Sequence, residues 1–220
     1  LIFKKTHKQT SLNIKDAMEF KQLNQLLNFE SYKLHSIKID HYNFNWKTFI
    51  EVYLEDYHVW AFHPGLNNIV NCDDLTWEFK SFSSIQKVPF REKDHSQSSP
   101  IYDHWKSKIN EQSGDSKPPF GAIWLTIYPF FMIEWYPNVI VVSHLIPDDA
   151  DHCRNIIEFY YPEETCKRDV GYIVDGVAKD LLYGGNEESI RNGLFYYQYP
   201  SEATTTQLGP TLTAVKHAAG

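Results

Sequence analysis

The sequence predicts a single domain that contains both helices and strands, and three observations lead to this prediction. At 220 residues the chain is long enough for one large core. Its composition of 42% hydrophobic, 15% aromatic and 22% charged residues is typical of globular proteins. Helical and strand-like hydrophobic periods alternate along the chain, and most of the strand-like segments lie in its middle.

The first half of the chain begins with a polar, helix-favouring stretch, residues 1–30. Alternation from Leu34 to Trp46 predicts a strand with one slip of register, and another strand is expected between Leu75 and Val88. Between them, apolar residues recur at helical spacing and predict a helix of about three turns with one face in the core. The two helical stripes are Ala17, Met18, Phe20, Leu23, Leu26 and Leu27, and then Trp46, Phe49, Ile50, Tyr53, Leu54 and Tyr57.

The second half opens with the polar segment 91–119, which predicts a long loop or a loop with one helical turn around Trp105. Residues 120–147 predict two or three consecutive strands, with a turn at Tyr136-Pro137-Asn138. The segment "RNIIEFYYPEE" predicts a further strand. Helical spacing from Val170 to Leu182 predicts a helix that stops at Gly184-Gly185, and residues 201–220 predict a frayed tail or an extended cover.

Charge and cysteine usage exclude several classes of protein. A net charge of −7 argues against a nucleic-acid partner. The longest uncharged stretch, Pro118 to Ile133, contains Pro129 and is too short to span a bilayer. Three cysteines without CxxC spacing favour a reducing, cytoplasmic setting. The chain starts with Leu1 and shows no leader pattern, so we interpret it as a piece of a longer polypeptide without a signal peptide.

Chemistry concentrates in the segment "NWKTFIEVYLEDYHVWAFHPGL", Asn45 to Leu66. Glu51, Glu55 and His58 fall on one side of the predicted helix. His58 and His63 would lie about 140° apart on an unbroken helix, so they can share an ion only if the helix distorts or ends between them. Two convergent imidazoles suit iron or zinc. The other interpretation is that both histidines are capping or surface residues, and spacing alone does not decide between the two.

The same segment closely resembles the catalytic-domain signature of the alpha subunit of Rieske-type aromatic-ring-hydroxylating oxygenases. The residues that carry the resemblance are Asn45, Trp46, Lys47, Glu51, Glu55, Tyr57, His58, His63 and Pro64. It extends to "AIWLTIYPFFMIEWYPNVIVVSHLIP" and "NIIEFYYPEE", and so covers about residues 30–165. It implies an α+β, helix-grip (START-like) domain, in which a curved antiparallel sheet surrounds a long C-terminal helix.

The resemblance also implies site residues and cofactors. His58 and His63 correspond to ligands of a mononuclear Fe(II), and Glu55 to the acid that bridges electron flow from a Rieske [2Fe-2S] cluster. Asn45 and Tyr57 are further catalytic candidates from the signature. Counting from Glu164, the third ligand falls on Glu187, with Asp180 as the alternative. Glu187 and Glu188 could instead be solvated acids at a helix end.

The implied activity is hydroxylation of an aromatic or similar apolar substrate with O2, either as a monooxygenase or as a dioxygenase. No cysteine here has the CxH or CxxH context of a Rieske cluster, so electrons must come from a Rieske domain outside this chain and a reductase. The family implies a homotrimer of alpha subunits. Six aromatic residues could line the substrate cavity or simply fill the core, namely Tyr57, Trp60, Phe62, Phe130, Phe131 and Trp135.

Two alternatives remain open at this point. A metal-free START-like module could bind a small apolar molecule, and an uncertain third ligand is what such a protein would show. A zinc hydrolase could use His58, His63 and a carboxylate with a bound water. The hydrolase ranks below the module because the sequence offers it no convincing general base.

Overall fold

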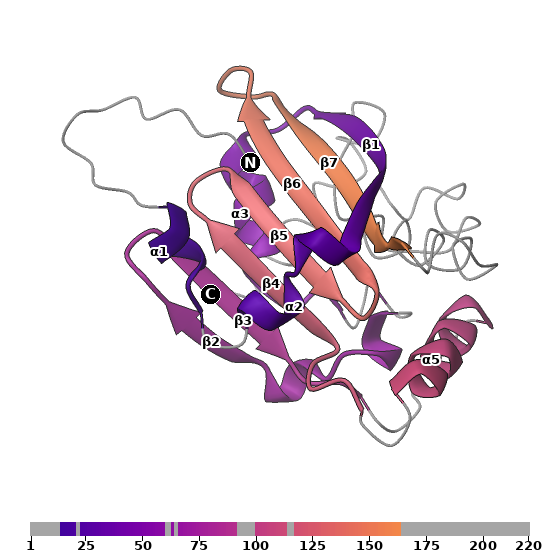
Figure 1. The fold of residues 1–220 in the computed structure, drawn as a ribbon. Helices are drawn as coiled ribbons and strands as arrows, with labels where there is room; N and C mark the ends of the chain where they lie inside the picture. Colours follow the sequence, from indigo (N-terminus) through magenta and orange to yellow (C-terminus); the bar gives the residue numbers. More distant parts are fainter. Residues whose placement is uncertain are drawn as a thin grey trace.

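The structure, a computed structural model, describes residues 14–20, 23–59, 63, 66–91, 100–113 and 117–163. Its centre is a seven-stranded antiparallel sheet with the order β1-β7-β6-β5-β4-β3-β2 (Figure 1). The strands are β1 (Tyr32–Tyr42), β2 (Thr76–Phe79), β3 (Ser83–Val88), β4 (Ala122–Ile127), β5 (Phe131–Tyr136), β6 (Val139–Pro147) and β7 (Cys153–Pro162).

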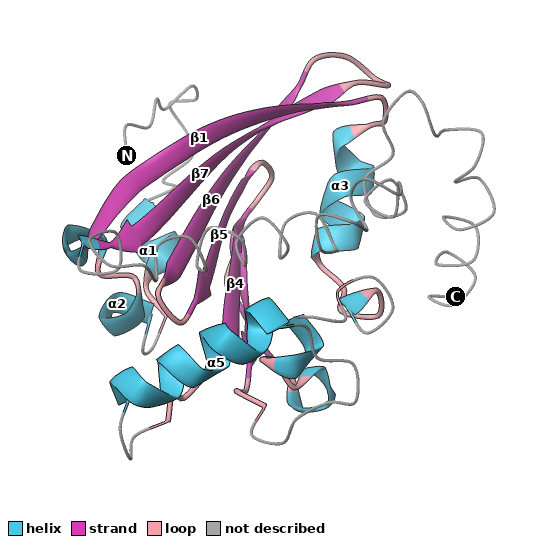
Figure 2. Ribbon diagram, turned by 90° about the vertical axis from the view of Figure 1, so that its right-hand side faces the viewer, coloured by secondary structure: helices cyan, strands magenta, loops and turns pink. Residues whose placement is uncertain are grey.

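Short helices cover both faces of this sheet. On one face lie α1 (Ile14–Met18) and α2 (Leu23–Leu26), and on the other lies α3 (Trp46–Tyr53), as Figure 2 shows. The strands β1, β7 and β6 curve over toward the side that carries α3. Three short 3₁₀ turns, η1 (Phe29–Ser31), η2 (Leu66–Asn68) and η3 (Cys72–Asp74), complete the first half. None of the described helices is long and apolar enough to cross a membrane.

Strict alternation of side chains divides the interior into two sides. Along β7, every second residue from Cys153 to Tyr161 is buried on the α3 side, while the residues between them are only partly buried. On the other side, Ala17, Phe20 and Leu23 pack on a cluster of strand residues that includes Ile133 and Trp135. The predicted stripe at residues 17–27 therefore does form core, although it is split between two short helices.

The prediction of two or three strands within residues 120–147 is confirmed, with three present, β4, β5 and β6, and the strand predicted after them is β7. The predicted turn is also confirmed, because Pro137 and Asn138 join β5 to β6 and Asn138 adopts a left-handed φ of 67°. β1 ends at Tyr42 rather than Trp46, and its irregular register lies between Leu34 and Ser36.

The single strand predicted between Leu75 and Val88 is wrong, because the segment folds into the hairpin β2–β3. The Lys80 N–H donates to the Ser83 carbonyl at 2.8 Å and closes the turn. The Lys80 amine also donates to the Asp16 carbonyl at 2.9 Å and so ties this turn to α1. The turn contains neither glycine nor proline, and Ser81 within it is only a weak turn signal.

The prediction for residues 91–119, a long loop or a loop with one helical turn around Trp105, underestimates the helix, since the structure contains the 14-residue helix α5 (Pro100–Ser113) around Trp105. Pro100 occupies the first helical position, where its missing N–H costs nothing. Trp105 and Ile109, one helical turn apart, are 0% and 1% exposed and pack in the same core cluster as Tyr136 and Val139. Two large apolar residues on one face hold an otherwise polar helix against the sheet.

The mixture of an antiparallel sheet with helices on its faces is the predicted α+β class. The predicted helix at Val170–Leu182 and the tail at 201–220 lie outside the described residues.

Replacing Ile109 with alanine should lower the free energy of unfolding by about 2–5 kcal/mol, because it leaves a cavity between α5 and the sheet. Urea unfolding measures the change. The control is Asn110→Ala on the exposed side of the same helix, which should change stability by no more than about 0.5 kcal/mol. Equal losses from the two variants would contradict this packing of α5.

Candidate functional site

The site begins with α3, whose start is fixed by Asn45. The Asn45 side chain accepts a hydrogen bond from the Lys47 N–H at 2.9 Å, as an N-cap does. Its amide also donates to the Ala150 carbonyl, 2.5 Å away in the β6–β7 turn. Phe49 and Ile50 are buried against Met132 and Leu145. The helix is thus held both at its start and along its length, and Asn45 lies at the end opposite to the histidines.

α3 stops at Tyr53, earlier than the three turns that the sequence predicts. The chain then turns, and the Glu55 carboxylate accepts hydrogen bonds from the Tyr57 N–H at 2.5 Å and from the His58 Nδ1. Glu55 and His58 are therefore paired by a local turn rather than by a shared helix face. Tyr57, predicted to belong to the core stripe, is instead 60% exposed because the helix has ended before it.

A second local turn brings His63 back toward His58. The His63 N–H donates to the Val59 carbonyl at 2.9 Å, and the Asn67 N–H donates to the His63 carbonyl at 3.1 Å. The centroids of the His58 and His63 rings are 5.2 Å apart. The helix does end before the two histidines, and their rings converge, as sharing an ion requires.

The segment that follows His63 is packed tightly against the sheet. A Cβ at Gly121 would lie 2.4 Å from the Ile69 carbonyl oxygen, so only glycine permits this close approach. Arg91 donates to the Val70 carbonyl at 3.0 Å and to the Asn67 side chain at 3.2 Å. This packing fixes the chain on the far side of His63.

The donors around His58 and His63 fit a first-row transition metal. Glu55 occupies Nδ1 of His58, which leaves Nε2 as the nitrogen that can bind a metal, and an acid behind a ligating histidine is the usual arrangement. The His63 side chain is almost fully buried at 4% exposure. Within the described part of the chain, no group of three or more His, Cys, Asp or Glu side chains could hold an ion, so a third ligand has to come from elsewhere.

Cys72 packs against the core cluster that contains Trp105 and Tyr136, and its thiol is not ionised. Burial, reinforced by the negative charge of Asp56, raises the pKa of the Cys72 thiol to about 12. The free thiol therefore stays protonated at neutral pH.

The other predicted site residues fall into two groups. Phe130 packs on the α3 side near Trp46, whereas Phe131 and Trp135 point to the opposite side of the sheet, toward α1 and α2. Phe131 and Trp135 therefore belong to the core on the far side from the histidines. The remaining predicted residues, Trp60, Phe62, Pro64, Asp180, Glu187 and Glu188, lie outside the described residues.

The sequence interpretation passed over a buried acid on the α3 side of β5, Glu134. It is 9% exposed and accepts a hydrogen bond from the Tyr136 hydroxyl at 2.6 Å. The Trp124 indole in turn donates to the Tyr136 oxygen at 3.0 Å. Burial raises the pKa of Glu134 to about 7. A single acid at an inward position of the apolar strand "FMIEWY" was the signal that could have revealed it.

Residues 23–178 match the family of the ring-hydroxylating alpha subunit, catalytic domain. The chain belongs to this family. The resemblance drawn from the sequence is thereby confirmed.

Two similar relatives are putrescine 2-hydroxylases. The chain is 46% identical to the Bordetella bronchiseptica protein over 136 residues, which are 62% of this chain and 32% of that protein. It is 49% identical to the Ralstonia nicotianae protein over 138 residues, which are 63% of this chain and 38% of that protein. Choline monooxygenase of Beta vulgaris is 27% identical over 135 residues, 61% of this chain and 26% of that protein. The chain thus matches about one third of the length of its two nearer relatives.

Solved structures establish the fold. The quaternary ammonium Rieske monooxygenase CntA superposes with a TM-score of 0.57 at 20% identity, over 84% of this chain and 46% of that one. Naphthalene 1,2-dioxygenase with bound indole superposes with a TM-score of 0.56 at 13% identity, over 94% of this chain and 49% of that one. The chain therefore has the fold of a Rieske oxygenase catalytic domain, and the predicted fold class is confirmed.

The buried Glu134 generates a prediction about stability. Its pKa rises from the ordinary 4.5 to about 7 on folding, so the folded state keeps a proton that the unfolded state has lost. The free energy of unfolding should therefore fall by about 3 kcal/mol as the pH rises from about 4.5 to about 7. In Glu134→Gln this fall should disappear.

Urea unfolding between pH 4.5 and pH 8 measures this dependence. The control is Glu158→Gln on β7, where the Tyr160 hydroxyl donates to the acid at the same 2.6 Å but the residue lies on the other side of the sheet. Parallel pH profiles for the unmodified protein and Glu134→Gln would contradict the prediction.

Proposed function

We propose that this chain is the iron-binding part of an oxygenase that hydroxylates a small aliphatic amine with O2. The observation that carries the proposal is the pair of convergent imidazoles, 5.2 Å apart, with the Glu55 carboxylate on Nδ1 of His58. Family membership supports an oxygenase. The identities of 46% and 49% to putrescine 2-hydroxylases support an amine rather than an aromatic ring as the substrate.

In this proposal His58 and His63 hold a mononuclear Fe(II), and a carboxylate, Glu187 or Asp180, completes a two-histidine, one-carboxylate face. When bound, the iron supplies the activation of dioxygen. Glu55 keeps the His58 ring in one orientation by accepting from Nδ1. His63 is buried, so water reaches its ring poorly and the site stays dry on that side.

Electrons are proposed to come from a Rieske [2Fe-2S] domain and its reductase. Glu55 is suited to meet such a donor because its side chain keeps 16% exposure while it holds His58. The homotrimer and a donor from the neighbouring subunit remain predictions from the family. Catalytic roles for Asn45 and Tyr57 also remain predictions, although Asn45 already serves as the cap of α3.

The aromatic substrate remains the alternative, and two further alternatives lose support. A metal-free module would gain nothing from a buried His63 beside an acid-paired His58. A zinc hydrolase would have to arise within a family of oxygenases. Neither alternative accounts for the site as simply as iron does.

Beyond the iron of the electron donor itself, the protein purified together with its donor should contain about one further iron per chain, and His58→Ala should lose that iron. Elemental analysis after anaerobic Fe(II) loading measures the iron. A matched control is His152→Ala, because His152 also pairs through Nδ1 with an acid three residues earlier, Asp149, at 2.8 Å, but on an exposed turn. The control should keep its iron. Absence of this further iron from the loaded, unmodified protein would refute the proposal.

The substrate is tested on the same preparation by mass spectrometry. With O2 and reductant, 1,4-diaminobutane should gain one oxygen atom and naphthalene none. If naphthalene is oxygenated and the diamine is unchanged, the proposed amine substrate is wrong and the aromatic substrate takes its place.

Glu55→Gln should retain the iron but lower product formation by about ten- to a hundredfold, because an amide holds the His58 ring less firmly than a carboxylate does. The measurement is product formed per iron atom. A control is Asp149→Asn at the exposed pair, which should leave product formation unchanged. Full activity of Glu55→Gln would contradict the role given to this acid.

A further inference from the structure

Glu134 is a buried carboxyl for which the described residues provide no cation. Its one hydrogen-bond partner among them is the Tyr136 hydroxyl, and no lysine, arginine or histidine in the described part of the chain forms an ion pair with it. A buried charge without a counter-charge is costly, and proteins normally pair it. A positively charged ligand would supply the counter-charge that the described residues do not provide.

Other groups on the same side of the sheet also lack partners. Gln86 Oε1, Thr126 Oγ1 and Asn155 Oδ1 are buried and make no hydrogen bond among the described residues. Each of the two amide nitrogens donates one hydrogen bond, that of Gln86 to the Tyr53 carbonyl at 3.4 Å and that of Asn155 to the Ser143 hydroxyl at 3.3 Å. What the three groups share is a buried oxygen that can accept a hydrogen bond.

The strand register places Glu134, Gln86 and Thr126 in neighbouring rows, whereas Asn155 pairs with Leu145 farther along the sheet. Gln86 pairs with Trp124, Trp124 with Glu134, and Glu134 with Val141. Thr126, two residues from Trp124, pairs with Met132 in the next row. Since side chains two apart on a strand point to the same side, these acceptors share the side of the sheet that carries α3.

This side of the sheet is also where the histidine segment packs. The Gln86 amide donates to the carbonyl of Tyr53, the last residue of α3. Val59, which follows His58, and Leu66, which follows His63 by three residues, belong to the same core cluster as Trp124 and Tyr136. The acceptors and the proposed iron ligands therefore border one interior region.

The chemistry of these groups distinguishes between kinds of ligand. An ammonium group carries a positive charge and N–H donors, and it satisfies both the carboxylate and the unpaired oxygens. An aromatic hydrocarbon offers neither, and it would leave each of them buried and unsatisfied at a cost of about 1–3 kcal/mol per group. The pKa of about 7 for Glu134 means that a nearby cation can readily bring it to the charged form at neutral pH.

We propose that the Glu134 carboxylate binds an ammonium group of the substrate, held in place by the Tyr136 hydroxyl. This inference rests on the proposed function and names the residue that makes the site select an amine. Glu134 thus determines specificity, whereas the histidine pair and Glu55 serve the reaction itself.

The test is calorimetric titration of the full protein with its electron donor, in the absence of O2, at pH 8. The unmodified protein should bind 1,4-diaminobutane, and Glu134→Gln should bind it at least about tenfold more weakly, as expected when one partner of a buried charge pair is removed. The neutral analogue butane-1,4-diol should bind both proteins equally. Glutamine keeps an acceptor for Tyr136, so this variant preserves the local hydrogen bond.

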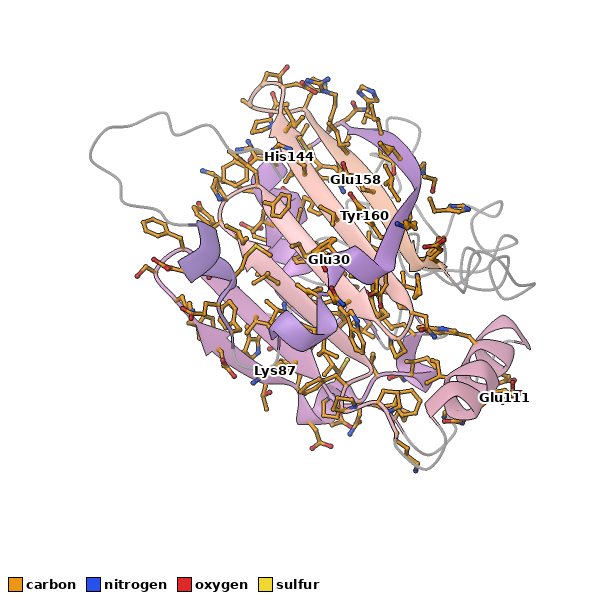
Figure 3. The ribbon with its side chains drawn as sticks, viewed as in Figure 1. Glu30, Lys87, Glu111, His144, Glu158 and Tyr160 are labelled. Carbon is orange, nitrogen blue, oxygen red and sulfur yellow. The ribbon has the colours of Figure 1, made fainter. Side chains whose placement is uncertain are left out.

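The matched control is Glu158→Gln, the equivalent acid–tyrosine pair on β7. Figure 3 shows Glu158 and Tyr160 from the side of α1 and α2, which is opposite to α3. This variant should bind the diamine as the unmodified protein does. Equal affinities of the unmodified protein and Glu134→Gln, or no diamine binding by the unmodified protein, would overturn the inference.

A second measurement needs no variant. Diamine affinity of the unmodified protein should fall several-fold from pH 8 to pH 6 as Glu134 takes up a proton, while butane-1,4-diol affinity stays constant. The groups that face Glu134 within the described residues are the phenols of Tyr136 and Tyr53 and three side chains that do not titrate, Trp124, Gln86 and Val141. A diamine affinity independent of pH would overturn the inference.

Failure of this inference and failure of the proposed function give different results. If the diamine is hydroxylated but Glu134→Gln binds it unchanged, the function stands and Glu134 is not the specificity residue. If the diamine binds in a Glu134-dependent way but is never oxygenated, the inference stands and the proposed oxygenation of this amine fails.

Discussion

Because the sheet is covered on both faces, polar side chains that point into the interior cannot hydrogen-bond to water, and the rest of the structure depends on this constraint. Nearly every inward position of β4, β5 and β6 is therefore filled by an apolar side chain that packs on a helix. The exceptions cluster on the side of α3. Because a buried polar group needs a partner, these exceptions identify the part of the interior that is built for something other than packing.

The histidine site depends on where α3 stops. A longer helix would have placed His58 and His63 on different sides, whereas the stop at Tyr53 lets two short turns bring the rings together. The stop also frees the Glu55 carboxylate to accept from the backbone of Tyr57 and from the His58 ring. The site therefore forms where the helix α3 ends. Packing against the sheet holds the chain both before and after that point.

The sequence predicted those parts of the fold whose local pattern agrees with their final environment. The strands β4 to β7 are long apolar runs bounded by turn residues, and they were predicted correctly. The length of α5 was underestimated because its stability comes from Trp105 and Ile109 meeting the sheet, which a polar sequence does not reveal. The β2–β3 turn was missed because it has no glycine or proline, and a tertiary hydrogen bond from the Lys80 amine to α1 helps to hold it.

The residues of the candidate site also divide into those with a local sequence signal and those that depend on long-range contacts. The two histidines and Glu55 lie close together in the sequence, so a motif could identify them. Glu134 is about seventy residues away along the chain and becomes visible only when strand alternation shows which way it points and what it lacks. Long-range pairing of this kind is not encoded in any short stretch of residues.

The turn between β6 and β7 limits the changes in loop length that the protein can tolerate. Hairpin tips usually tolerate changes in length because little depends on their shape. Here the Asp149 side chain accepts from the N–H groups of Asp151 and His152, both at 2.8 Å, and the Ala150 carbonyl receives the Asn45 amide. An insertion at this exposed tip would release Asn45, the N-cap of α3, so we expect natural variation in loop length to avoid this turn.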